Sequence, residues 1–169
     1  LSKKDGGIRP IAVGFVWRRL TAKCANVFAT ERTKPFLSPK QLGVSVRGGA
    51  EGAIHATRRF VTTLPDEHAF IKLDFCNAFN SLRRDSMLEA VFNVVPEIYN
   101  FCNLTYAAPS CLWFGREIVW SEEGAQQGDP LGPLLFSLTV QPLLASLQSD
   151  ISFGYLDDFS AGGDLVTLA

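Results

Sequence analysis

The sequence has few residues of the kinds that bind zinc or form disulfides. It holds four cysteines and two histidines in 169 residues. No two cysteines form a CxxC pair, and His55 and His68 do not complete a zinc pattern. Four cysteines in a chain of this length also do not make a disulfide scaffold. We therefore expect reduced cysteines and an intracellular protein.

Repeats, phosphate loops and membrane spans are also missing from the sequence pattern. No internal repeat or heptad is present, and the absence of GxxxxGK[ST] excludes a P-loop. Residues 130–149 carry no charge, but Pro133, Gln141 and Pro142 interrupt them, which predicts a buried helix rather than a bilayer span. No membrane partner is expected. The 13 Phe and 47% hydrophobic residues exclude a disordered chain.

Basic residues are missing from the last third of the chain. No Lys or Arg follows Arg116, and residues 61–169 hold 4 basic against 14 acidic side chains. Residues 1–60 hold 12 basic against 3 acidic side chains. This division suggests that one part binds phosphates and the other binds cations, although an accidental surface distribution gives the same counts.

Strands and helices are mixed without regular βαβ alternation, which favours the α+β class. Helical spacing and turn residues predict the individual elements. These are a hairpin turning at residues 5–7, a helix from Trp17 closed by Pro35 and Pro39, a glycine-rich loop at 41–49, a helix at about 50–64, a strand at 70–74, helices near 85–95 and 97–107, a hairpin at 112–120 turning at 115–116, a helix at about 131–147, and a hairpin at 153–161 turning at 156–158.

Carboxylates stand where a predicted strand ends and where a predicted hairpin turns. Asp74 ends the strand at 70–74, and Asp157 and Asp158 lie in the turn of the last hairpin. Adjacent ionised carboxylates repel each other, and the nearest basic residue in sequence is far away. A divalent cation would relieve the repulsion, and oxygen ligands favour Mg²⁺ or Mn²⁺. The alternative is that the pair only caps a solvated turn.

Two other segments have unusual polar or aromatic content. In residues 124–136, Gly128 would let the backbone approach a ligand, Gln127 offers donors and acceptors, and Pro130 fits the first turn of a helix. An ordinary loop before a core helix explains the proline but not the paired glutamines. Phe75 and Phe79 follow Asp74 closely, and both could equally belong to the core.

Three segments in this order resemble the first palm motifs of reverse transcriptases. They are LDFCNAFNSL at residues 73–82, GAQQGDPLGPLLF at 124–136 and FGYLDDF at 153–159. The resemblance is nearest to the enzymes of non-LTR retrotransposons. KKDGGIRPI at residues 3–11 resembles the fingers hairpin of the family, and residues 41–52 resemble its next glycine-rich segment. The order of these motifs along the chain makes the resemblance specific.

The resemblance implies an RNA-directed DNA polymerase that adds deoxynucleotides to a DNA primer on an RNA template. Asp74 and Asp157 would hold two Mg²⁺ ions, with Mn²⁺ as a substitute, and Phe75 would contribute its backbone carbonyl. Asp158 would support the site rather than bridge both ions. The implied catalytic carboxylates are therefore Asp74, Asp157 and Asp158.

The resemblance also implies a nucleotide pocket. Phe79 matches the aromatic residue that excludes a ribose 2′-hydroxyl. Lys3, Lys4 and Arg9 match residues that hold the incoming triphosphate, which agrees with the basic first third of the chain. Asn77, Ala78, Gln127 and Gly128 complete the implied nucleotide-binding residues.

In fold, the resemblance implies a right-hand polymerase with an antiparallel palm sheet backed by helices. Residues 1–50 and 82–123 would form the fingers, and residues 51–81 and 124–169 the palm. The thumb would be absent, so we expect a fragment of a longer reading frame that could be inactive alone. Asn80 stands where many relatives have Asp, and Gly132 where many have Ser, which predicts tuned activity.

Two alternatives remain beside this hypothesis. An RNA-templated RNA polymerase shares acidic palm motifs, but Phe79 argues against an enzyme that must admit the 2′-hydroxyl. A catalytically silent RNA-binding remnant would keep the fold and the basic region. The intact aspartates at 74, 157 and 158 argue against such decay.

Overall fold

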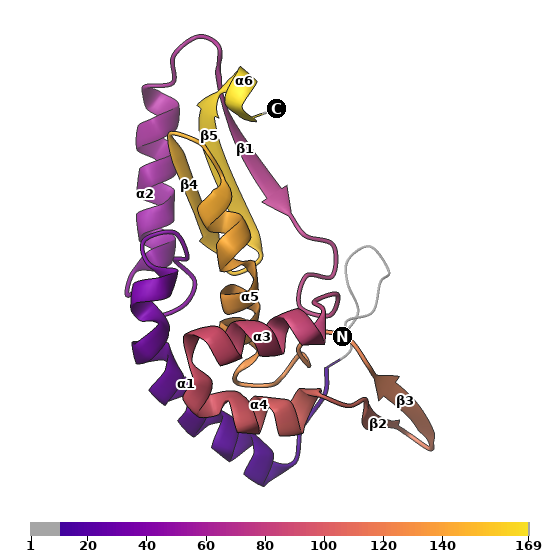
Figure 1. Ribbon diagram of the computed structural model, residues 1–169. Helices are drawn as coiled ribbons and strands as arrows, with labels where there is room; N and C mark the ends of the chain where they lie inside the picture. The colour runs from indigo at the N-terminus through magenta and orange to yellow at the C-terminus, as the bar shows by residue number, and fades with distance from the viewer. Residues whose placement is uncertain (1–10, 169) are drawn as a thin grey trace.

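The computed structural model describes residues 11–168. The predicted opening hairpin falls largely on residues 1–10, so it lies outside the described residues together with Lys3, Lys4 and Arg9. Figure 1 shows the elements that follow. In chain order they are α1 (Val16–Leu37), α2 (Gly49–Thr62), β1 (His68–Asp74), α3 (Arg84–Val94), the 3₁₀ turn η1 (Pro96–Ile98), α4 (Tyr99–Tyr106), β2 (Ser110–Phe114), β3 (Glu117–Ser121), α5 (Gly132–Ser146), β4 (Ile151–Tyr155), β5 (Asp158–Asp164) and α6 (Leu165–Leu168).

The described strands form two antiparallel sheets. The larger has the order β1-β5-β4, and the smaller is the hairpin β2-β3. Helices and antiparallel sheet are mixed as the α+β prediction requires. Helix α2 runs along one side of the larger sheet, and its Phe60 ring lies 6.1 Å from the Phe70 ring of β1 (Figure 1). The larger sheet therefore has a helix beside it and its two carboxylate-bearing strands, β1 and β5, as direct neighbours.

The hydrophobic core lies where α1, α3, α4 and α5 meet. Helix α5 is apolar nearly all round, as expected of a helix surrounded by protein. This confirms the prediction that residues 130–149 contain a buried helix, and no helix among the described residues is long and apolar enough to cross a membrane. The core side chains with at most 5% exposure on these helices and on η1 include Met87, Val91, Ile98, Cys102, Tyr106, Leu134, Leu135, Leu138 and Leu144.

The first helix differs from its prediction in length and in its buried face. Pro35 lies inside α1, which continues to Leu37 and ends at Ser38. A proline in the last turn removes only a hydrogen bond near the helix end, so it does not stop the helix there. The predicted apolar face is exposed at Trp17 and Val27, by 68% and 71%. The helix instead packs through small side chains such as Ala22 and Ala29, which allow close approach to its neighbours.

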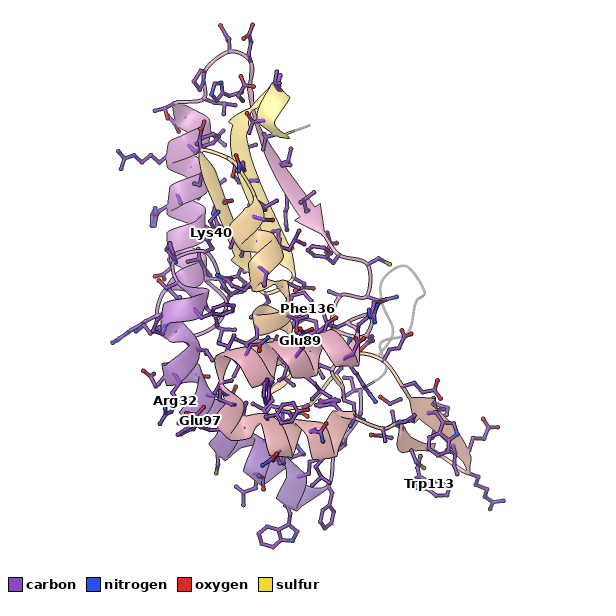
Figure 2. All side chains as sticks on the ribbon, in the orientation of Figure 1. Arg32, Lys40, Glu89, Glu97, Trp113 and Phe136 are labelled. Atoms are coloured by element: carbon purple, nitrogen blue, oxygen red, sulfur yellow. The ribbon has the colours of Figure 1, made fainter. Side chains whose placement is uncertain are left out.

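The other predicted elements are present, with shifted ends. The single helix predicted at 97–107 is divided into η1 and α4. Helix α5 begins at Gly132 with Pro133 in its first turn, so the assignment of Pro130 to that turn was wrong. The two predicted hairpins that fall on described residues, at 112–120 and 153–161, are confirmed as β2-β3 and β4-β5. The hairpin β2-β3 projects from the body, and Trp113 on it is 71% exposed (Figures 1 and 2).

Candidate active site

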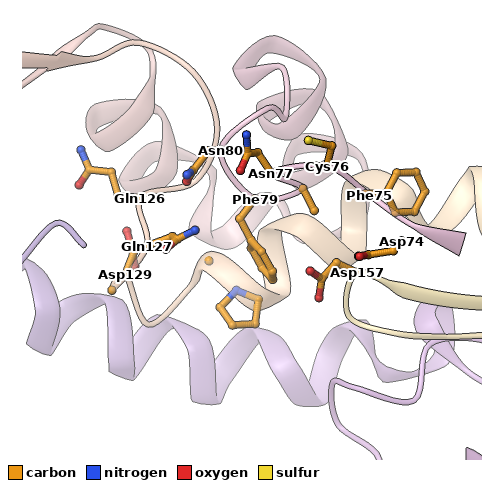
Figure 3. Close-up of a pocket in the computed structure, with 14 residues that line it drawn as sticks. Asp74, Phe75, Cys76, Asn77, Phe79, Asn80, Gln126, Gln127, Asp129 and Asp157 are labelled. Carbon is orange, nitrogen blue, oxygen red and sulfur yellow. The ribbon is translucent and has the colours of Figure 1, made fainter. Parts of the chain in front are cut away.

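The larger sheet and the loops beside it surround a cavity of about 730 Å³. This volume is typical of a small-molecule site. The lining residues come from the end of β1 and the loop after it, from the loop before α5 and the first turn of α5, and from the β4–β5 turn (Figure 3). They are Asp74, Phe75, Cys76, Asn77, Ala78, Phe79, Asn80, Gln126, Gln127, Gly128, Asp129, Gly132, Pro133 and Asp157.

Strand pairing brings the acidic residues together. Asp74, the last residue of β1, is the register partner of Asp158, the first residue of β5. Directly opposed residues of an antiparallel pair share one face of the sheet, with their Cβ atoms roughly 4.5–5.5 Å apart. Asp157 lies in the two-residue turn before β5, and its side chain is beside that of Asp74 in Figure 3. Three carboxylates thus gather at one end of the sheet.

A lysine on the neighbouring strand balances part of this negative charge. Lys72 Nζ lies 2.9 Å from Asp158 Oδ1. The hydrogen bond to Asp158 and the nearby carboxylates raise the pKa of Lys72. Sequence distance suggested that no basic residue was near the carboxylates, and this expectation was wrong. Cross-strand register, rather than chain order, places Lys72 there.

Asp158 therefore differs from the two other carboxylates. Asp74 and Asp157 line the cavity, whereas Asp158 is outside the lining and is paired with Lys72. Among residues 11–168, no group of three His, Cys, Asp or Glu side chains is placed to enclose a metal ion. Mg²⁺ in nucleotide sites is commonly held by one or two carboxylates plus substrate phosphates and water. The oxygen donors Asp74 and Asp157 fit that arrangement.

Aromatic pairs fix the walls next to the carboxylates. The Phe79 ring packs on the buried Phe136 ring of α5, with centroids 4.7 Å apart. The Phe75 ring meets Phe159 of β5 edge-on at 5.0 Å. Both phenylalanines are half-buried, line the cavity and also pack against core rings. The two interpretations drawn from sequence, core and site, therefore apply to the same side chains.

The loop before α5 is joined to the loop after β1 by backbone hydrogen bonds. Ala125 N donates to Phe79 O at 2.9 Å, and Gly124 N donates to Leu82 O at 2.8 Å. Gly128 has φ +111, and a Cβ there would lie 2.7 Å from Ala12 O. The backbone freedom of Gly128 thus accommodates the chain's own N-terminal segment, rather than only a ligand as expected from sequence.

Asp129 stabilises this loop and was missed by the sequence analysis. Its side chain is 3% exposed and accepts hydrogen bonds from Tyr106 Oη at 2.6 Å, Arg18 Nη2 at 3.1 Å and Leu131 N at 2.9 Å. Burial, followed by the charge of Asp129, raises the pKa of Tyr106, which keeps its phenol a donor. The only local signal was an aspartate directly before a proline in a loop.

The predicted site residues are therefore divided by the structure. The cavity lining contains Asp74, Phe75, Asn77, Ala78, Phe79, Gln127, Gly128 and Asp157, whereas Asp158 lies outside it and pairs with Lys72. The triphosphate-binding residues predicted at 3, 4 and 9 lie outside the described residues. The arrangement offers two open carboxylates, an aromatic wall and an amide side chain within one cavity.

Comparison with known proteins identifies the family. The family model described as "Reverse transcriptase (RNA-dependent DNA polymerase)" matches residues 1–164. The chain is similar to the retrotransposable element SLACS 132 kDa protein of Trypanosoma brucei gambiense, with 31% identity over 94% of this chain. It spans 14% of the length of that relative. The resemblance predicted from the sequence motifs is confirmed, and the chain belongs to the reverse transcriptase family.

Proposed function

We propose that this chain forms the catalytic core of an RNA-directed DNA polymerase, which adds deoxynucleotides to a DNA primer on an RNA template. The observation that carries the proposal is the shared cavity of Asp74, Asp157, Phe79 and Gln127. A binding module has no need for two neighbouring open carboxylates, because they repel phosphate. Enzymes that transfer phosphoryl groups use such carboxylates to hold divalent cations.

Asp74 and Asp157 would hold the two Mg²⁺ ions, or Mn²⁺ in their place, together with the Phe75 carbonyl. When bound, the ions lower the barrier to attack by the primer 3′-hydroxyl and to departure of pyrophosphate. Asp158, paired with Lys72, would support these ligands from the neighbouring strand. The protein's task in this chemistry is mainly to position the reacting groups and balance charge.

Phe79 would select the sugar. Its ring packs on the Phe136 ring, with centroids 4.7 Å apart. This packing would keep the Phe79 ring from moving aside for a larger nucleotide. A 2′-hydroxyl would meet this ring, which favours deoxynucleotides over ribonucleotides. Asn77, Ala78, Gln127 and Gly128 would line the base and sugar side of the pocket, and Lys3, Lys4 and Arg9 would bind the triphosphate.

In the proposed assignment, the palm comprises residues 51–81 and 124–169 and contains the larger sheet. Residues 1–50 and 82–123 would belong to the fingers. In this assignment, the cavity carboxylates all lie in the palm, and most of the basic residues of the first third lie in residues 1–50 of the fingers. The proposed partners are an RNA template, a DNA primer and deoxynucleoside triphosphates.

Primer extension on an RNA template with Mg²⁺ tests the proposal. The complete protein that contains this chain is assayed with deoxynucleotides and with ribonucleotides separately. Asp157→Asn is the test variant, and Asp150→Asn is its matched control because Asp150 pairs with His68 away from the cavity. We expect deoxynucleotide incorporation that Asp157→Asn abolishes and Asp150→Asn retains, with the fold of both variants intact by circular dichroism.

The other outcomes distinguish the alternatives. Preferential ribonucleotide incorporation would identify an RNA-templated RNA polymerase. A folded protein that binds RNA without synthesis would be a silent remnant. Synthesis by Asp157→Asn at the wild-type rate would refute the metal-binding assignment.

A further inference from the structure

The segment after α1 forms a direct contact with the hairpin that carries Asp157. Gln41 forms an isolated parallel bridge with Gly154 of β4. Leu42 N donates to Gly154 O at 2.7 Å, and Gly154 N donates to Lys40 O at 2.8 Å. Lys40 lies beside the larger sheet in Figure 2. The glycine-rich loop predicted at residues 41–49 therefore begins as an added strand-like edge of the sheet.

The Gln41 side chain reaches further, to the turn itself. It is 0% exposed, and its Oε1 accepts a hydrogen bond from Leu156 N at 2.9 Å. Its Nε2 donates to Leu156 O at 3.4 Å, so one amide holds both backbone groups of a single turn residue. Oε1 also accepts from Gly43 N at 3.0 Å, which fixes the amide in its own loop. A buried amide with its hydrogen bonds made is a rigid anchor.

The residue that Gln41 holds has an unusual backbone conformation. Leu156 has φ +57, which side chains other than glycine rarely adopt and which persists where surrounding contacts impose it. Gly43 lies against the same backbone, because a Cβ at Gly43 would be 2.6 Å from Leu156 N. Leu156 is followed directly by Asp157, which lines the cavity.

We propose that Gln41 is a positioning residue that holds Leu156 in its left-handed conformation and thereby directs the Asp157 carboxylate into the cavity beside Asp74. Gly43 serves the same turn by leaving room for the contact. The inference rests on the proposed polymerase function, and it assigns a role to the glycine-rich segment in the active site. Without the Gln41 amide, the turn can relax toward negative φ and move the carboxylate.

The test compares two substitutions that remove the contact in different ways. Gln41→Met keeps the length and removes the hydrogen bonds, whereas Gln41→Asn keeps the amide but shortens its reach by one carbon. We expect either variant to lower kcat for deoxynucleotide addition by roughly tenfold to a hundredfold, since misplacement by about 1 Å can cost that much. The KM for deoxynucleotides should change less than about twofold, because the proposed triphosphate contacts are elsewhere.

Two further measurements separate positioning from general stability. Hydrogen–deuterium exchange of the peptide spanning residues 153–159 should quicken in both Gln41 variants, because the Leu156 amide loses its acceptor. Val91→Ala is the control, since Val91 is fully buried in α3 and its loss weakens the core without touching the turn. It should lower the melting temperature and leave both kcat of the folded protein and exchange in this peptide unchanged.

A second route to the same turn is available if Gln41 variants do not fold. Gly43→Ala leaves Gln41 in place and pushes on Leu156 from the loop side, so it should also lower kcat. Wild-type kcat in Gly43→Ala or in the folded Gln41 variants, while Asp157→Asn is inactive, would overturn the positioning role alone. A kcat loss in the folded Val91→Ala protein equal to that of the Gln41 variants would overturn it as well. Full synthesis by Asp157→Asn would instead overturn the polymerase site.

Discussion

The two ends of the cavity contain aspartates in opposite environments. Asp129, at the α5 end, is 3% exposed and is held by a phenol, a guanidinium and a backbone amide. Asp74, at the sheet end, is exposed and faces another carboxylate across the β1–β5 pair. Among residues 11–168, no ion pair includes Asp74, whereas its opposite neighbour Asp158 pairs with Lys72.

This difference indicates that Asp129 stabilises the fold, whereas Asp74 is available for the proposed chemistry. A buried carboxylate with donors on each side stabilises the loop that it closes, because removing it leaves those donors unpaired. An open carboxylate beside a like charge contributes repulsion unless a cation arrives. The protein thus tolerates unfavourable carboxylate repulsion at the sheet end of the cavity, whereas the buried charge of Asp129 is compensated by its three donors.

The largest expected effects come from replacing one aspartate at each end of the cavity. Asp74→Asn should cost about 4 kcal/mol of transition-state stabilisation, roughly a thousandfold in synthesis, with unfolding stability unchanged or raised. Asp129→Ala should lower the unfolding free energy by about 3 kcal/mol, because Arg18 and Tyr106 lose a buried partner. Folded Asp129→Ala should retain measurable synthesis. Urea denaturation and primer extension on both variants measure the contrast. Equal stability losses in the two variants would remove the distinction.

Much of the sheet end of the cavity was predictable from the sequence. A strand ending on Asp74 and a turn carrying Asp157 are local patterns, and the motif resemblance placed Phe79 and Gln127 with them. Lys72 was not predictable, because its contact depends on the register between β1 and β5. Two-residue alternation places Lys72 on the same face as Asp74, but only pairing brings Asp158 within its reach.

The other end of the cavity depends on contacts that no local pattern reveals. Arg18 is 111 residues from Asp129, and Tyr106 is 23 residues away. The buried face of α1 was also not predictable from the sequence. Trp17 and Val27 are more hydrophobic than Ala22 and Ala29, yet the alanines are the buried residues. Helical spacing predicted the helix correctly, whereas the face that packs was decided by how closely α5 approaches. Local periodicity carries no information on that distance.

A smaller effect is expected from removing the hydroxyl group of Tyr106, which donates a hydrogen bond to Asp129. Tyr106→Phe keeps the ring and removes one buried hydrogen bond, so it should cost about 1 kcal/mol of unfolding free energy near neutral pH. Burial and Asp129 raise the pKa of Tyr106, so the unfolded chain loses this proton first as pH rises. Wild-type stability should therefore fall above about pH 10, the ordinary phenol range.

The same linkage supplies the measurement for Tyr106. Urea denaturation between pH 8 and pH 11 should show a flatter decline in Tyr106→Phe than in the wild type. Some decline remains in both proteins, because burial also raises the pKa of Cys102 to about 12. Identical slopes in the two proteins would mean that the phenol does not remain protonated in the fold, and the proposed role of Tyr106 as a permanent donor to Asp129 would be wrong.

The smallest effect concerns Lys72, the cation paired with Asp158 at the sheet end of the cavity. Lys72 neutralises Asp158 at 2.9 Å while both side chains remain about half exposed or more. Lys72→Met should lower the Mg²⁺ concentration for half-maximal synthesis by about two- to fivefold, the range expected for loss of an exposed charge pair, because one competing cation is gone. It should also lower stability without metal and enlarge the gain in melting temperature on adding Mg²⁺.

Arg32→Met is the control, since Arg32 forms an exposed ion pair with Glu97 at 2.8 Å on the helical side of the molecule (Figure 2). A Mg²⁺ requirement that rises in Lys72→Met would show that Lys72 organises the carboxylates for the metal instead of competing with it.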